Sequence, residues 1–281
     1  MQEQRKKRGA ILLAGLLAVS LLRGAPAARP AQGSLSVELP ILMYHHLLRE
    51  SARHGKYVIS PDDFAADLDW LLSQGYETVT VAQLIGWVNS TGSLPEKPVM
   101  ITFDDAYESF YEYAFPILQQ RNCKAVLGVV GRYADEYTAS EDHHINYSYC
   151  TWTQLDEMVQ SGLVELQNHS YDLHTYEGEK KGSMKVSGEA VGDYEQRLRG
   201  DVGRMQSLCE YWCGVTPTAF VYPFGSVSAE ALPVLKDMGF QAALTCLEQV
   251  NYLTGDAGQL FSLGRFNRPD GTSAQQILQS Q

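Results

Sequence analysis

Short apolar segments alternate with amphipathic helical patterns along the chain from residue 40 onward. A short apolar run bounded by turn residues is typical of a buried strand, whereas apolar residues three and four positions apart indicate a helix. The pattern predicts strands at Pro40–His46, Pro98–Phe103, Lys124–Val130, Leu163–Gln167, Thr218–Tyr222, Gln241–Thr245 and Leu260–Phe266. It predicts helices at 61–74, 81–88, 108–121, 152–160, 189–212 and 228–238.

The boundaries of the first helix follow from its residues. Ser60 is a typical N-cap, Pro61 suits the first helical position, and Gly75 ends the pattern. Strands and helices alternate in this way without an internal linker, which predicts an α/β fold with a mainly parallel sheet. Six or seven such units favour one closed or nearly closed barrel over two domains.

The N-terminal residues resemble a secretory signal. Basic residues at positions 5–8 precede the apolar run Ile11–Leu22 and the small residues Ala25-Pro26-Ala27. The run is shorter than the roughly 20 residues of a bilayer span, and an uncleaved N-terminal membrane anchor is the alternative to cleavage. We expect a signal peptide or anchor over 1–28, a linker over 29–38 and a folded domain over 39–281. The protein is expected to be secreted or extracytoplasmic at the cell surface.

The net charge argues against a nucleic-acid partner, and the cysteine spacing argues against a zinc knuckle. The formal net charge is -11, which disfavours nucleic acid as a partner. The chain has five cysteines, and the spacing of Cys209 and Cys213 has no matching second pair, so we expect no zinc knuckle. We expect buried thiols with at most one disulfide.

Two carboxylates end the strand at 98–103. Asp104 and Asp105 repel each other, and a metal ion would absorb that charge. Because successive residues of a strand point in different directions, one Asp can bind the metal while the other accepts a proton from metal-bound water. The alternative is that Asp105 and Glu108 are only first-turn residues of the next helix.

Two histidines follow the strand at 163–167. The spacing of His169 and His174 keeps them apart on a regular helix or strand, so they meet only across a turn. Two imidazoles reaching one metal from such a turn would suit zinc. The alternative is two unrelated, partly exposed histidines.

Two further strand ends carry polar or turn residues. His45 and His46 end the first strand and are candidates for an acid, a base, a ligand or core residues. Tyr222-Pro223-Phe224-Gly225 predicts a tight turn whose backbone N–H groups can act as oxyanion donors, or an ordinary turn.

Together these segments resemble a known family. Thr102–Asp105, the His-Ser-Tyr-Asp-Leu-His of 169–174 and the Tyr-Pro-Phe-Gly of 222–225 resemble the NodB-homology polysaccharide deacetylases, carbohydrate esterase family four. The resemblance extends over about residues 40–268. Met43–His46 and the five-residue histidine spacing are more similar to the branch that includes the exopolysaccharide deacetylases acting on poly-β-1,6-N-acetylglucosamine.

The resemblance implies a deformed (β/α) barrel of about seven strands, with circularly permuted motif order, and one divalent metal ion. By position, Asp104 corresponds to the general base and Asp105, His169 and His174 to the metal ligands. Phe224 stands where an aromatic residue donates its backbone N–H to the oxyanion. The other residues expected near the substrate are Tyr222 and Arg265, and Tyr171 and Asp172 are expected to orient the ligands.

The chain departs from the family pattern at three places. Ala106 replaces the Gly that usually follows the Asp pair. Val221-Tyr222 occupies the place of the Arg that steadies the base, and we expect Arg265, with Arg268 as the alternative, to supply that guanidinium. The late Leu-x-His motif is absent, since its nearest match ends in Arg265.

The missing late histidine changes the expected general acid. All histidines of the chain lie at or before position 174. In the resembling branch a Tyr-His near the N-terminus takes this role, and His45 follows Tyr44 in that way. We therefore expect His45 to be the general acid and His46 to point to the opposite side of the strand.

The expected activity is hydrolysis of N-acetyl groups from N-acetylglucosamine units of an extracellular or cell-wall polysaccharide by a monomer. Zinc is the default metal, and cobalt, nickel and manganese are alternatives. One alternative function is a polysaccharide-binding protein on a degenerate deacetylase scaffold, supported by the missing Arg and His. Another is an esterase that removes O-acetyl groups from a carbohydrate.

Overall fold

A computed structural model describes residues 36–178 and 180–281. Ser36–Gln281 form one compact unit. The expected signal peptide or anchor over 1–28 and most of the expected linker lie outside the described residues. Within them, no helix combines the length and the apolar composition that a bilayer span requires.

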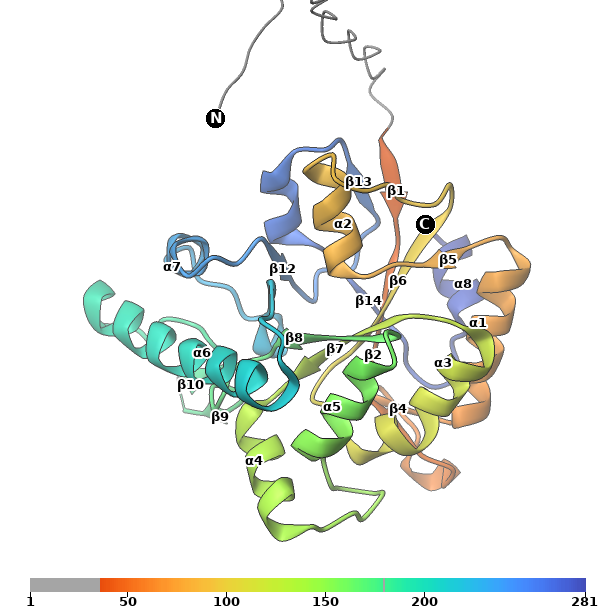
Figure 1. The fold of residues 1–281 in the computed structure, drawn as a ribbon, viewed down its shortest axis with the longest axis horizontal. Coiled ribbons are helices and arrows are strands. Elements are labelled where there is room, and N and C mark those ends of the chain that lie inside the picture. Colours follow the sequence, from red (N-terminus) through yellow and green to blue (C-terminus); the bar gives the residue numbers. More distant parts are fainter. Residues whose placement is uncertain (1–35, 179) are drawn as a thin grey trace, which may run out of the picture. The chain divides into compact units, whose positions relative to one another are not determined.

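Seven parallel strands form a curled sheet in the order β12-β11-β8-β7-β6-β2-β14, and helices lie around its outer side (Figure 1). Their bounds are β2 Ile41–Tyr44, β6 Pro98–Phe103, β7 Ala125–Val129, β8 Val164–Asn168, β11 Ala219–Val221, β12 Ala242–Leu244 and β14 Phe266–Asn267. The predicted deformed (β/α) barrel of about seven strands is thus confirmed. A short strand, β5 (Glu77–Thr78), extends the sheet beside β6.

Three small two-stranded sheets lie outside the curled sheet. They are β1 (Val37–Leu39) with β13 (Asn251–Leu253), β3 (His46–Leu47) with β4 (Val58–Ile59), and β9 (Tyr176–Glu177) with β10 (Lys180–Lys181). The helices are α1 Pro61–Ser73, α2 Val81–Val88, α3 Phe115–Arg121, α4 Gly131–Ser140, α5 Trp152–Gln160, α6 Val191–Cys213, α7 Ala231–Asp237 and α8 Ala274–Gln279. The predicted cap of α1 is present, because Ser60 Oγ accepts the Asp63 N–H at 2.9 Å.

Some predicted elements differ from the structure. The helix expected at 108–121 begins as a π-helical turn, Phe110–Ala114, and α3 follows with Pro116 as its second residue, whose missing N–H interrupts regular helical bonding. Of the strand expected at 260–266, only Phe266 belongs to β14, and residues 260–262 belong to a 3₁₀ helix over Ala257–Ser262, which is started by the Asp256 side chain accepting the Gly258 N–H. Helix α4 was not predicted. All five cysteines are free thiols, so the disulfide permitted by the sequence does not form.

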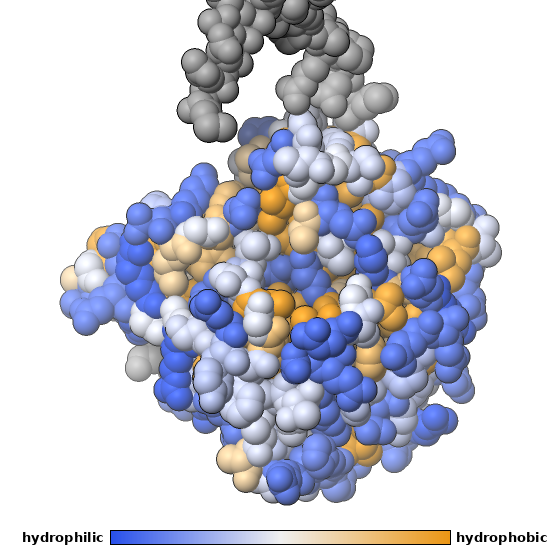
Figure 2. Space-filling model, viewed as in Figure 1, coloured by the Kyte–Doolittle hydropathy of each residue, from blue (hydrophilic) through white to orange (hydrophobic). Residues whose placement is uncertain are grey.

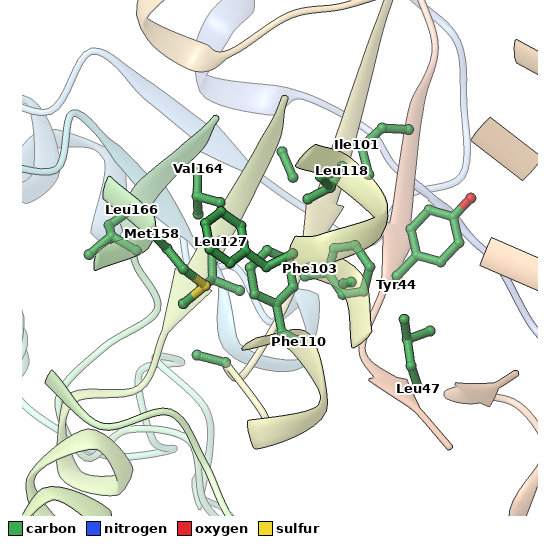
Figure 3. Packing of buried hydrophobic residues seen from close by; sticks show 14 of the residues in the cluster. Tyr44, Leu47, Ile101, Phe103, Phe110, Leu118, Leu127, Met158, Val164 and Leu166 are labelled. Carbon is green, nitrogen blue, oxygen red and sulfur yellow. The ribbon is translucent and has the colours of Figure 1, made fainter. Parts of the chain in front are cut away.

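Buried residues pack on both faces of the curled sheet, because successive residues of a strand point to opposite faces. Phe103 of β6, Leu127 of β7 and Leu166 of β8 face the surrounding helices, and Phe103 packs edge-to-face on Phe110 at 4.8 Å between ring centroids (Figure 3). Met100 and Val126 face the interior of the curled sheet. The face of the molecule seen in Figure 2 is mostly polar, with only small separate apolar areas.

The same alternation places the polar residues at the strand ends. Tyr44 and Phe103 belong to the helix-facing cluster, so His45 and Asp104, one position later, turn to the interior. Leu166 also faces the helices, so His169, three positions later, turns to the interior. Arg265 directly precedes the helix-facing Phe266 and therefore turns to the interior as well. Four interior positions from distant parts of the chain therefore meet at one end of the sheet.

Candidate active site

A cavity of about 550 Å³ lies at the C-terminal ends of the strands. Its lining residues are Met43, His45, His46, Lys56, Tyr57, Val58, Asp104, Asp105, Tyr107, His169, His174, Lys181, Phe224, Cys246, Glu248 and Asn267. Six of the eight site residues predicted from sequence are among them. Tyr222 and Arg265 are not.

Asp105, His169 and His174 form a cluster that fits one metal ion. One ligand atom from each residue lies within 4.8 Å of the other two. His169 Nε2 and His174 Nε2 are 3.5 Å and 3.3 Å from Asp105 Oδ1, which is buried and has no hydrogen-bond partner among the described residues. The other ring nitrogen of His169, Nδ1, bonds the Val221 carbonyl at 2.7 Å, which leaves Nε2 free to face a cation. The donor set of one carboxylate and two imidazoles suits zinc and its transition-metal neighbours.

A left-handed turn brings Asp105 to the histidines. Asp105 and Ala106 have φ angles of 72° and 59°. The turn is held from the opposite segment, since the Ala106 carbonyl accepts the Cys150 N–H at 2.8 Å and the Glu108 N–H bonds the Ser148 carbonyl at 2.8 Å. Asp105 thus reaches the cluster from a turn, and not from the strand.

Ala106→Gly is expected to stabilise the protein. A residue with a Cβ in the left-handed region costs about 1–2 kcal/mol, which glycine avoids. We expect the free energy of unfolding in urea to rise by about 1 kcal/mol. Asn122→Gly is the matched control: Asn122 has φ 50° at the end of α3, remote from the site, and Asn tolerates this conformation, so its gain should be smaller. An unchanged or lower value for Ala106→Gly would contradict strain at this turn.

The loop that carries both histidines is fixed by Asp201 of α6. The two carboxylate oxygens of Asp201 accept the N–H groups of Tyr171 and Asp172, each at 2.8 Å. Ser170 has φ 77°, and its N–H bonds Asn168 Oδ1 at 2.9 Å. The ring centroids of His169 and His174 are consequently 5.0 Å apart. The two histidines are therefore neighbours across a turn, and the alternative of two unrelated residues does not hold.

Tyr171 and Asp172 do not orient the histidine rings through their side chains. The Asp172 carboxylate pairs with Arg132 Nε at 2.7 Å, and the Tyr171 hydroxyl donates to Asp135 at 3.1 Å. The residue that orients this loop is Asp201, which the sequence analysis missed. Nothing in the sequence of a long polar helix distinguishes Asp201 from the other acidic residues on it.

Asp104 forms a buried ion pair with Arg265. Arg265 Nη1 and Nη2 donate to the two carboxylate oxygens at 2.6 Å and 2.9 Å, and Nε donates to the Thr245 carbonyl at 2.9 Å. Burial by itself raises the pKa of the Asp104 carboxyl, but the charges of Arg265 and His169 outweigh it and hold that pKa well below its usual value. Asp104 is therefore ionised.

Two predicted substrate contacts have to be corrected. Arg265 is fully buried behind Asp104, and its guanidinium is used by Asp104 and the Thr245 carbonyl. Tyr222 is 1% exposed and packs edge-to-face on Phe220 on the helix-facing side of the sheet. Because strand positions alternate, Val221 faces the interior and Tyr222 cannot. Neither residue lines the cavity.

The first-strand histidines both line the cavity and have different partners. His45 Nδ1 is buried without a hydrogen-bond partner in the described part of the chain, and its ring lies 4.7 Å from that of Tyr57. Burial lowers the pKa of the His45 imidazole, and Asp104 and Asp105 offset this only in part. His46 Nδ1 bonds Ser109 Oγ at 2.6 Å and its ring stacks on Tyr107. His45 is thus the histidine with an uncommitted ring nitrogen.

Phe224 and the segment 175–190 form the rim on the side of His174. Phe224 has φ 58°, is 40% exposed, and its ring lies 4.3 Å from that of His174. The segment 175–190 contains the β9–β10 hairpin, from which Lys181 lines the cavity. The Gly182 N–H closes this segment onto the Thr175 carbonyl at 3.0 Å.

Known proteins share this fold and these sequence features. The chain is 30% identical over 256 residues to the poly-β-1,6-N-acetyl-D-glucosamine N-deacetylase of Escherichia coli K12, covering 85% of this chain and 38% of that protein. It is 25% identical over 218 residues to the protein of the same name in Staphylococcus epidermidis, covering 78% of this chain and 71% of that one. The chain thus spans well under half the length of the E. coli relative.

Solved structures agree with the sequence comparisons. IcaB from Ammonifex degensii superimposes with a TM-score of 0.70 at 29% identity, covering 86% of this chain and 95% of that one. A de-N-acetylase from Aggregatibacter actinomycetemcomitans gives a TM-score of 0.73 at 27% identity, covering 86% and 99%. Residues 91–243 match the family described as polysaccharide deacetylase. The resemblance inferred from the motifs is confirmed, and the chain belongs to the polysaccharide deacetylase family.

Proposed function

We propose that the protein is a metal-dependent enzyme that removes N-acetyl groups from N-acetylglucosamine units of an extracellular polysaccharide. The relatives named above as poly-β-1,6-N-acetyl-D-glucosamine N-deacetylases make that polymer the first substrate to test. The observation that carries the proposal is the meeting, in one cavity, of the Asp105–His169–His174 cluster with an ionised Asp104. We also propose that it acts as a monomer outside the cytoplasm, where such polymers are found.

Asp105, His169 and His174 would hold the divalent ion, with zinc as the first candidate. When bound, the ion polarises the acetyl carbonyl and lowers the pKa of a bound water. Asp104 accepts the proton of the attacking water, and Arg265 keeps that carboxylate ionised and correctly oriented. These assignments give each of the two adjacent carboxylates a separate task.

Two further groups complete the hydrolysis. The backbone N–H of Phe224 donates to the carbonyl oxygen as negative charge develops there. His45 gives a proton to the leaving nitrogen as the C–N bond breaks, so the products are acetate and a free amine.

The structure weakens the argument for a binding protein without activity. That alternative rested on the missing third-motif Arg and the missing late His. Arg265 supplies a guanidinium to Asp104 from another part of the chain, and His45 places an imidazole in the cavity. An ionised, buried carboxylate beside three side chains able to bind a metal has a chemical use in hydrolysis and none in simple sugar binding.

His174→Ala is expected to lose both bound metal and activity. It removes one of three ligands, and metal content measured by mass spectrometry should fall to a small fraction of that of the wild type. Acetate release from poly-β-1,6-N-acetylglucosamine should fall with it. His144→Ala, which removes an exposed imidazole outside the cavity, is the matched control and should change neither. Full metal content in His174→Ala would refute the ligand assignment.

A further inference from the structure

A second hollow adjoins the active-site cavity. It has a volume of about 350 Å³ and lies against β14 and α8. Lys56, Glu248 and Asn267 line both the active-site cavity and this hollow. The two spaces therefore meet at these three residues, and we call the second one the distal hollow.

The junction between the two spaces is cross-linked. Asn267 Nδ2 donates to the Lys56 carbonyl at 2.8 Å, and the Asn267 N–H bonds Glu248 Oε1 at 3.3 Å. Further along, the Asp270 N–H bonds the Gly55 carbonyl at 2.9 Å. Segments far apart in the sequence are thus held in a fixed relation where the two spaces adjoin, so the junction is a built feature of the fold.

The lining of the distal hollow suits an uncharged sugar. Thr272, Gln276 and Ser280 supply hydroxyl and amide groups, while the edges of the largely buried Phe266 and Ile277 side chains supply a small apolar area. A pyranose ring needs this combination, because it has hydroxyl groups at its edge and C–H groups on its faces. Lys56 and Glu248 are the lining residues with ionised side chains, and their charges are opposite.

Asn267 has an unused acceptor at the junction. Its Oδ1 is buried and finds no hydrogen-bond partner in the described residues. Such an orphaned oxygen is uncommon in a folded protein and is satisfied when a ligand donates to it. A sugar hydroxyl bound at this junction would be such a donor.

An exposed aromatic ring lies beside the same junction. Tyr57 is 47% exposed, lies 4.7 Å from the His45 ring, and has Lys56 Nζ 5.0 Å from its centroid. It therefore lies between the proposed general acid and the junction. Its position gives a sugar a flat apolar surface to lie against on the way to the distal hollow.

We propose that the distal hollow is a subsite for further sugar units of the same glycan chain whose acetyl group is removed in the active-site cavity. This inference rests on the proposed deacetylase function. Binding far from the reacting bond strengthens the complex of long substrates in both ground and transition states. Long oligomers should therefore have a lower KM than short ones at similar kcat.

The test is to fill the distal hollow and compare substrate lengths. We would measure acetate release from β-1,6-linked N-acetylglucosamine dimers and pentamers, using zinc-loaded protein. The wild type should favour the pentamer by about tenfold in kcat/KM, the effect expected of one additional subsite of moderate affinity. Thr272→Trp should remove most of this preference by raising KM for the pentamer, while metal content and dimer kinetics stay as in the wild type.

Two further variants serve as a substitute for Thr272→Trp and as its control. Ser280→Trp fills the same hollow from the exposed end of α8, so it replaces Thr272→Trp if that variant does not fold. Gln275→Trp adds the same bulk on the exposed surface of α8 outside the hollow and should behave as the wild type.

The failures of the two proposals are distinguishable. Equal kcat/KM for dimer and pentamer in the wild type, or an unchanged pentamer preference in the filled variants, would overturn the subsite and leave the deacetylase standing. No acetate release from either oligomer by the metal-loaded wild type would overturn the proposed function itself.

Discussion

Asp104→Asn is expected to keep its metal and lose turnover. The amide has nearly the shape of the carboxylate but cannot accept the proton of the attacking water. Loss of a positioned base lowers kcat by about 10²–10⁴-fold. Asp105, His169 and His174 are untouched, so metal content should match that of the wild type. The measurements are acetate release from poly-β-1,6-N-acetylglucosamine and metal content of the same sample.

The control must separate chemistry from stability, because the substitution also breaks a buried ion pair. Leaving Arg265 without its anionic partner costs about 3–5 kcal/mol. Asp67→Asn breaks an equivalent pair outside the cavity, where Arg268 Nε meets Asp67 Oδ2 at 2.7 Å and both side chains are buried. It should lower the free energy of unfolding to a similar extent but retain kcat. Metal loss in Asp104→Asn comparable to that of Asp105→Ala would instead make Asp104 a ligand.

His45→Ala is expected to retain metal and lose roughly 10²-fold or more in kcat on the N-acetylated polymer, the usual worth of positioned acid catalysis. The reason is that an amine is a poor leaving group unless it is protonated as the C–N bond breaks. An aryl acetate has a leaving group that departs without a proton. The loss on that substrate should therefore be much smaller, which a general packing defect would not produce.

His46→Ala is the companion to this variant. His46 lines the same cavity, but its Nδ1 is committed to Ser109 Oγ, and its ring to Tyr107. Its removal should lower the free energy of unfolding but leave the ratio of the rates on amide and ester substrates nearly unchanged. If His46→Ala shows the selective loss on the amide and His45→Ala does not, the two roles are exchanged. If neither variant loses amide hydrolysis, the assignment of a histidine acid is wrong.

The strand positions and much of the site were predictable because buried strands carry a strong periodic signal. Once β2, β6 and β8 are placed, alternation alone turns His45, Asp104 and His169 to the interior. The same rule applied to β11 would have turned Tyr222 toward the helices beside Phe220. The position of Tyr222 in the motif suggested a substrate contact, but the alternation of residues along the strand points its side chain to the helices.

Other parts of the site depend on contacts that a single sequence does not encode locally. Arg265 meets Asp104 across 161 residues, and only the absence of the usual Arg pointed to it. The left-handed turn at Asp105 was hidden because Ala106 stands where glycine would have signalled it. Asp201, which fixes the histidine loop, lies on a long helix rich in charged residues, where nothing marks it.

We propose that N-deacetylation depends on a divalent ion held by Asp105, His169 and His174. The most direct measurement is acetate release from poly-β-1,6-N-acetylglucosamine by the wild type as purified, after removal of metal with a chelator, and after return of zinc to the metal-free protein. Activity should disappear with the metal and return with zinc, and His174→Ala should not recover under the same treatment. Undiminished acetate release from metal-free protein would contradict the claim.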